Sequence, residues 1–187
     1  MLRASAAPTA DDNFRQERPT HRRRIFFAGA KASAVTGGSA TMMIKSSKRN
    51  PCRSLRKAAS ADSPARVINI ASIDGMHTSP FSGYAYGTSK AAVIHLTRFM
   101  AAQHVGEHIL VNGIAPGPFP TWMLSTGVGF GGKTEGVDWD SVAERNPSGR
   151  VGTPQDIAGL AMFLSSRAGA YISGHTIPCD GGIVASS

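Results

Sequence analysis

Three side chains in the middle of the chain could carry out acid–base chemistry: Tyr86, Lys90 four residues after it, and Ser72, 14 residues before it. A free phenol has a pKa of about 10 and exchanges protons poorly near neutrality. A neighbouring ammonium favours the phenolate and lowers that pKa, so that a phenol can exchange a proton with a carbonyl or an alcohol. Positions four apart share one face of a helix, so Tyr86 and Lys90 are a candidate catalytic pair. An ordinary amphipathic pair is the alternative.

The elements around these residues can be predicted from the pattern. Apolar residues between positions 84 and 103, followed by Gly106, predict a buried helix that carries Tyr86 and Lys90. Val67–Ile70 is a β-branched run between turn signals and predicts a strand. Ser72 directly follows this strand, where parallel α/β folds place ligand-binding groups. A common turn serine is the alternative interpretation.

The remaining elements continue the alternation of strands and helices. Residues 109–117 predict a second strand, and Thr176–Pro178 a third. Thr153 can cap a helix that has Pro154 at its first position and ends near Ser166. This order predicts an α/β fold with a parallel sheet and right-handed crossovers.

Five linked motifs then resemble the C-terminal half of the short-chain dehydrogenase/reductase family in order and spacing. The motifs are 67–72, 86–92, 111–117, 149–154 and 178–182. The resemblance covers residues 54–187 and implies part of a doubly wound, Rossmann-like fold. Two further blocks, 106–109 and 167–174, look like the branch of 3-oxoacyl-carrier-protein reductases, which includes enzymes of bacterial glycolipid synthesis and implies a role in secondary metabolism.

The resemblance implies a role for each reacting group. Tyr86 would be the proton donor or acceptor, and Ser72 would hydrogen-bond the substrate carbonyl. Lys90 would bind the nicotinamide ribose and lower the pKa of Tyr86. The reaction would be the NADP-dependent reduction of a ketone of 3-oxoacyl type to a secondary alcohol, or the reverse, with NAD as the alternative cofactor. An acyl-carrier or CoA thioester would be the substrate, and the protein would form a homo-oligomer.

Further residues would line the nicotinamide pocket by the same resemblance. They are Tyr86, Lys90, Pro116, Gly117, Phe119 with the backbone around it and Ile114, and Thr121. Asn112 would be structural, and the Gly/Pro-rich loop 118–137 would cover the substrate.

The first part of the chain departs from the family pattern. The nearest match to the glycine-rich phosphate turn is Val35–Met43, where Thr41 and Met43 stand at positions that the backbone needs free of side chains. Only 71 residues precede Ser72, fewer than the family's first strands and helices require. We therefore expect that the N-terminal half of the fold is missing, that the strand at Val67 exposes an unpaired edge, and that the adenosine half of the cofactor has no seat.

Composition divides the chain in the same way. The 187 residues are 41% hydrophobic and 17% charged, as in a globular protein. Residues 1–66 hold 14 Lys/Arg against 4 Asp/Glu, a balance of +10, whereas residues 67–187 hold 6 against 8, a balance of −2. We interpret 1–53 as an atypical basic, poorly ordered segment and 54–187 as the catalytic half. The run 21–24 has no interleaved aromatic residue, so nucleic-acid binding is not expected.

Other function classes find little support. Cys52 and Cys179 do not suggest a disulfide framework or a metal site, and no third metal ligand is evident beside His104 and His108. No apolar run approaches the roughly 20 residues of a membrane span. A cytoplasmic location is expected. Organelle targeting is the alternative, because the chain begins Ala/Ser-rich with arginine, although acidic residues soon follow.

Three functions stay open at this level. The first is the reductase described above. The second is a non-catalytic family remnant or a gene model with a wrong start, suggested by the missing glycine turn. The third is an oligomerising or binding module that uses the exposed sheet edge and the basic arm.

Overall fold

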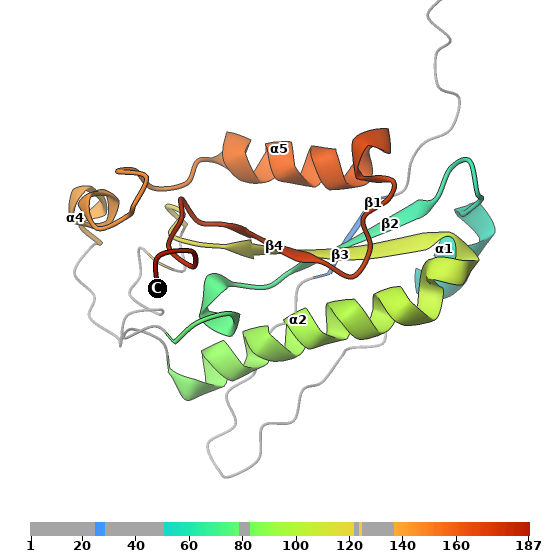
Figure 1. The fold of residues 1–187 in the computed structure, drawn as a ribbon, viewed down its shortest axis with the longest axis horizontal. Coiled ribbons are helices and arrows are strands. Elements are labelled where there is room, and N and C mark those ends of the chain that lie inside the picture. The colour runs from blue at the N-terminus through green and yellow to red at the C-terminus, as the bar shows by residue number, and fades with distance from the viewer. Residues whose placement is uncertain (1–24, 29–50, 79–82, 122–123, 125–136) are drawn as a thin grey trace, which may run out of the picture.

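The computed structural model describes residues 25–28, 51–78, 83–121, 124 and 137–187. These residues form a four-stranded parallel sheet in the order β1-β2-β3-β4 (Figure 1). Its strands are β1 (Ile25–Ala28), β2 (Ala65–Ile70), β3 (Ile109–Pro116) and β4 (Thr176–Cys179). Among the described strands β4 is an edge. The carbonyl of His175 accepts a hydrogen bond from the N–H of Gly113 in β3, and that of Cys179 accepts one from the N–H of Gly117 just after β3.

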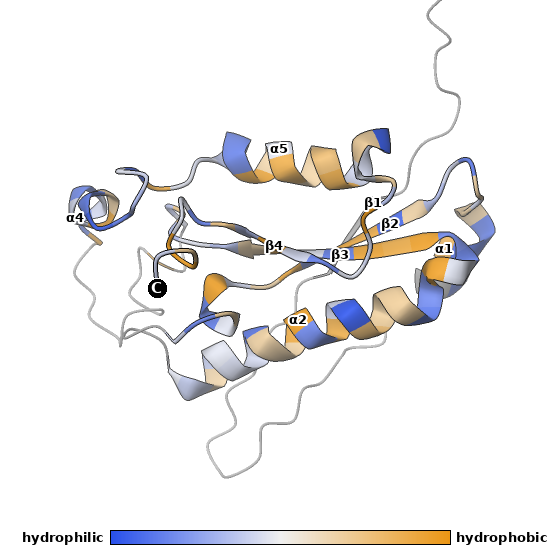
Figure 2. Ribbon diagram, in the orientation of Figure 1, coloured by the Kyte–Doolittle hydropathy of each residue, from blue (hydrophilic) through white to orange (hydrophobic). Residues whose placement is uncertain are grey.

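The two central strands are buried because helices cover both of their faces, as is usual for parallel strands. The long helix α2 (Tyr84–His104) packs on one face, where Val67 and Val111 meet Ala101. The helix α5 (Pro154–Ser165) packs on the other face. There Ile68 and Ile114 surround Leu164. Figure 2 shows the hydrophobic strand β3 between the two helices.

The two crossovers have opposite hands. The strands follow one another across the sheet in sequence order, yet α2 and α5 lie on opposite faces (Figure 1). The β2–α2–β3 connection is right-handed, as predicted. The β3–α5–β4 connection is left-handed, so the prediction of right-handed crossovers throughout is wrong for this one. Such connections are right-handed in about 98% of cases. In this exception α5 packs on the face of the sheet that α2 leaves open.

The part of the chain interpreted as weakly structured contains two elements. The strand β1 pairs with β2 in the register Phe26↔Val67. The helix α1 (Pro51–Ala58) packs Leu55 into the cluster below β2. The predicted unpaired edge at β2 is therefore wrong, because the apolar run at Ile25 covers it. The division of the chain at residues 53 and 54 falls within α1 and stays a prediction.

The other predicted elements agree with the structure. The helix α2, the strands β2 to β4 and the capped start of α5 all form near the expected residues. Pattern reasoning missed the short helix α4 (Trp139–Glu144) and the 3-10 helices η1 (Ile73–Gly75), η2 (Val105–Glu107) and η3 (Arg167–Gly169). The glycine-turn candidate 35–43 and most of the loop 118–137 lie outside the described residues. None of the described helices is long and apolar enough to cross a membrane.

Candidate functional site

Ser72 lies at the carboxyl end of β2 and begins the turn η1. Its hydroxyl oxygen accepts a hydrogen bond from the backbone N–H of Asp74 at 3.2 Å, which fixes the side chain as the cap of this turn. Only 7% of the residue is exposed. The sequence therefore places a buried hydroxyl at the ligand-binding end of a parallel strand, as predicted.

Tyr86 lies in the first turn of α2, and its phenol makes a hydrogen bond with Ser72. Burial raises the pKa of the Tyr86 phenol above its usual value of 10.0, the Ser72 hydrogen bond lowers it, and the Asp74 carboxylate raises it again. The net direction is upward, which is opposite to the lowering expected from Lys90. Desolvation of the phenolate outweighs the other effects, so the neutral phenol is the favoured form.

Lys90 connects this helix to the strand that carries Ser72. Its ammonium Nζ donates to the carbonyl of Ile70 at 3.2 Å and lies 5.5 Å from the centre of the Tyr86 ring. Burial lowers the pKa of the Lys90 amine. An ammonium has three N–H donors. Two of them have no partner among the described residues and are available to a ligand.

The residues predicted to line the nicotinamide pocket do not all join this cluster. Pro116 ends β3, and the backbone of Gly117 approaches Asp180 so closely that a Cβ atom there would lie 2.8 Å from its Cα. Phe119 is buried against Gly152, and Thr121 is exposed. Their cofactor roles stay predictions.

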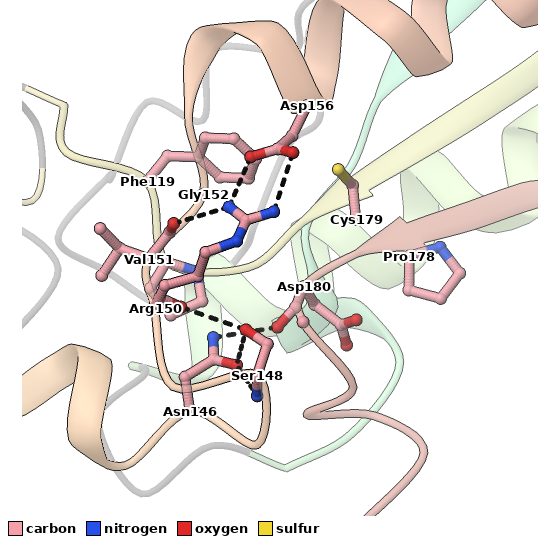
Figure 3. Close-up of a pocket in the computed structure, with 12 residues that line it drawn as sticks. Phe119, Asn146, Ser148, Arg150, Val151, Gly152, Asp156, Pro178, Cys179 and Asp180 are labelled. Carbon is pink, nitrogen blue, oxygen red and sulfur yellow. Dashed lines mark hydrogen bonds and ion pairs between the residues drawn. The ribbon is translucent and has the colours of Figure 1, made fainter.

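Phe119 lines a pocket of about 260 Å³ at the carboxyl end of β4 (Figure 3). An ion pair between Arg150 and Asp156, with atoms 2.7 Å apart, spans this pocket. Thr153 and Asp156 also form a reciprocal capping box at the start of α5. None of Ser72, Tyr86 and Lys90 lines this pocket.

The structural role predicted for Asn112 is confirmed. Its amide donates to the carbonyl of Ile172 at 2.8 Å and accepts from the backbone N–H of His175 at 3.1 Å. The side chain is buried within β3 and ties the segment after α5 to the sheet.

Sequence reasoning missed two contributors to the site, Asp74 and Gly75. The carboxylate of Asp74 acts on the Tyr86 pKa, and Gly75 lies against the backbone of α2. His104 interacts with Glu107 at 2.9 Å. In the described part of the chain, no three metal-ligating side chains gather.

A family model described as Enoyl-(Acyl carrier protein) reductase matches residues 27–184. A rhamnolipids biosynthesis 3-oxoacyl-(acyl-carrier-protein) reductase of Pseudomonas aeruginosa is 47% identical over 128 residues, which are 68% of this chain and 48% of that protein. The chain thus spans about half the length of the curated relative that it matches.

Solved structures, among them the following two, share the fold. The Pseudomonas aeruginosa RhlG/NADP active-site complex matches with a TM-score of 0.61 and 45% identity, covering 70% of this chain and 50% of that one. A 4-hydroxyisoleucine dehydrogenase complexed with NADH matches with a TM-score of 0.53 and 31% identity, covering 66% and 48%. The matched part therefore has the fold of proteins that bind nicotinamide cofactors.

Proposed function

The chain belongs to the short-chain dehydrogenase/reductase family, and we propose that it catalyses the nicotinamide-dependent interconversion of a ketone and a secondary alcohol. The observation that carries this proposal is the contact between the hydroxyls of Ser72 and Tyr86, with Lys90 on the same helix face. Two hydroxyls at the carboxyl end of a parallel strand can hold one carbonyl oxygen between them.

Each residue has a distinct task in the proposed reaction. Ser72 donates a hydrogen bond to the substrate oxygen and orients it. Tyr86 gives its proton to that oxygen when a ketone is reduced and takes a proton from the hydroxyl when an alcohol is oxidised. A nicotinamide cofactor, when bound, would supply or accept the hydride at the carbonyl carbon. Lys90 would hold its ribose through the two N–H donors that Ile70 does not use.

The neutral phenol suits the reductive direction. Because burial raises the Tyr86 pKa, the phenol keeps its proton at neutral pH and is ready to donate it. A nearby cation is expected to make that transfer easier once the substrate excludes water. The alcohol-oxidising direction needs the phenolate and is expected to gain rate as pH rises.

We infer the substrate class and the cofactor from relatives rather than from the pocket. The rhamnolipids relative is named a 3-oxoacyl-(acyl-carrier-protein) reductase, which supports a 3-oxoacyl thioester on an acyl carrier or on CoA. The similar structure with NADP supports NADP, and the one with NADH keeps NAD as the alternative. A cytoplasmic, homo-oligomeric protein remains our proposal as well.

Transfer of tritium from labelled NADPH to acetoacetyl-CoA by the purified chain tests the function. We expect transfer by the parent chain and a loss of about 100- to 10,000-fold in Tyr86→Phe, because the acid–base group is removed. Tyr171→Phe is the matched control, since that ring is fully exposed.

Calorimetric titration with NADPH separates loss of chemistry from loss of binding. A chain that binds NADPH and transfers no hydride would contradict the proposed reaction. A chain that binds none would favour the non-catalytic alternative. Equal transfer by Tyr86→Phe and the parent would exclude Tyr86 as the acid–base group.

A further inference from the structure

We propose that Gly75 is a positioning residue that sets the contact between Ser72 and Tyr86, with Thr97 as its counterpart on the helix. The proposal deepens the proposed function and rests on it for the meaning of the contact. Ser72 and Tyr86 come from different elements, the end of β2 and the start of α2. Some feature must therefore fix the distance between these two elements.

Gly75 provides the first fixed point. A Cβ atom on Gly75 would lie 2.6 Å from the backbone carbon of Lys90 and 2.6 Å from the backbone nitrogen of Ala91. Such a contact is with main chain, so no side-chain rotation can relieve it. The turn η1 can therefore lie directly on α2 only because residue 75 has no side chain.

The turn transmits this contact to Ser72. The N–H of Gly75 donates to the carbonyl of Ser72 at 3.1 Å, and the Ser72 hydroxyl accepts from the N–H of Asp74. The hydroxyl and the glycine thus belong to one small hydrogen-bonded unit. A displacement of Gly75 from the helix would move the Ser72 hydroxyl with it.

Thr97 provides the second fixed point, deeper along the helix. The amide of Asn69 on β2 donates to the Thr97 hydroxyl at 3.0 Å, and that hydroxyl donates to the carbonyl of Val93 at 2.8 Å. Asn69 is 3% exposed and Thr97 is fully buried. This hydrogen bond holds α2 against β2. A side chain added at Gly75 would therefore displace the turn η1 rather than the whole helix.

A titration of Tyr86 tests the proposal without any need for turnover. The chain has three tyrosines, and Tyr84→Phe with Tyr171→Phe leaves Tyr86 as the single one. In this background, ultraviolet difference spectra follow the phenol alone. The charged groups nearest to it are Asp74 on η1 and Lys90 on α2, and both are kept in every variant.

Four chains form a double-mutant cycle: the background chain, Ser72→Ala, Gly75→Ala and the double variant. Ser72→Ala should raise the Tyr86 pKa, because the hydrogen bond that lowers it is lost. Gly75→Ala should raise the pKa by part of the same amount, because the Asp74 carboxylate, which raises the pKa, moves away with the turn. This rise should be absent in the Ser72→Ala chain. Gly83→Ala is the control, because a Cβ atom there meets nothing within 4 Å.

Thr97→Val is the second positioning variant. It removes the hydrogen bond between Asn69 on β2 and Thr97 on α2 without adding volume, and so weakens the attachment of α2 to β2. Its shift should be smaller and should also vanish in the Ser72→Ala chain. Circular dichroism checks that each chain folds, and an unfolded Gly75→Ala chain leaves the decision to Thr97→Val.

Two results would overturn the proposal. One is an unchanged Tyr86 pKa in both positioning variants, and the other is an equal shift with and without Ser72. If the parent chain transfers hydride, Gly75→Ala should lower turnover by about 100-fold with NADPH affinity unchanged, as a misplacement of about 1 Å does. Absence of hydride transfer would count against the proposed function alone, since the titration stands without it.

Discussion

Two regions of the molecule differ in how far their polar groups are hydrogen-bonded within the chain. One is the cluster of Ser72, Tyr86 and Lys90, and the other is the corner around Arg150 and Asp156. In the corner, both carboxylate oxygens of Asp156 are bonded: Arg150 reaches them at 2.7 and 2.9 Å, and the N–H and hydroxyl of Thr153 at 2.8 and 2.7 Å. In the cluster, Lys90 uses one N–H donor, for Ile70. Both carboxylate oxygens of Asp156 are thus paired within the chain, whereas Lys90 has N–H donors left that a ligand could use.

The pKa directions repeat this difference. In the corner, the Arg150–Asp156 hydrogen bonds hold the pKa of the carboxyl far below its usual range and raise that of the guanidinium, so both charged forms are favoured. In the cluster, burial raises the pKa of Tyr86 and lowers that of Lys90, so in both groups the balance shifts towards the uncharged form. A pKa shifted by burial is typical of a reactive site, whereas mutually stabilised opposite charges are typical of a structural ion pair.

The largest effect is expected for Ser72→Ala, which tests whether the cluster serves catalysis rather than stability. We expect hydride transfer to fall by about 100- to 1,000-fold, as when one donor to a developing oxyanion is removed. The urea midpoint should change little. The measurement is tritium transfer beside urea unfolding on the same preparation. A large loss of stability with normal transfer per folded molecule would reverse the roles that we assign to the two regions.

Asn146→Ala in the corner should have the converse effect. Asn146 is buried, donates to the carbonyl of Asp180 at 3.1 Å and accepts from Ser148. Its removal leaves these partners unpaired, and we expect a loss of about 1–3 kcal/mol in the free energy of unfolding. Urea denaturation measures it, and the Tyr86 titration should be unaltered. A shifted Tyr86 pKa would show that the two regions are coupled.

Thr153→Ala removes the cap of α5 and is the milder test of the corner. We expect a loss of about 1 kcal/mol, the usual cost of an N-cap. Thermal unfolding by circular dichroism is sufficient, with Thr153→Ser as the control that keeps the hydroxyl. If both variants lost the same stability, the hydroxyl would not be the source of the effect.

The smallest expected effects are in the pH dependence of stability, and the two regions should act at opposite ends of the scale. The Asp156 pKa is lowered on folding, so its contribution is present above about pH 4 and is lost as pH falls towards the folded value. The Tyr86 pKa is raised, so its contribution is present below about pH 10 and is lost as pH rises through the folded value.

Asp156→Asn and Tyr86→Phe separate these two arms in urea titrations across pH. The first should flatten only the acid arm of the stability curve and the second only the alkaline arm. Should Tyr86→Phe leave the alkaline arm unchanged, the raised pKa of Tyr86 would be refuted.

Local signals were sufficient to predict much of the fold. The capping residue Thr153 and the β-branched run at Val67 specify their elements without help from distant parts of the chain. The strand β1 could not be found in this way, because four apolar residues gain their structure only by pairing with β2. The left-handed crossover likewise depends on which face of the sheet remained to be covered.

The same limit applies to the site. Residue types and spacing identified Ser72, Tyr86 and Lys90 as candidates, and the structure brings them together. The pKa direction of Tyr86 could not be predicted, because spacing gives the neighbouring ammonium but not the depth of burial. The role of Gly75 could not be predicted either, because it depends on how closely the turn η1 approaches the backbone of Lys90.

The edge strand β4 has a consequence for aggregation. The carbonyls of His175 and Cys179 face β3, so by the alternation of a strand the backbone of Thr176 and Pro178 faces outward. Proline has no N–H, which leaves Thr176 as the single outward donor of this four-residue strand. An incoming strand would find too few donors to pair with, and this edge is thereby protected against the growth of a cross-β assembly.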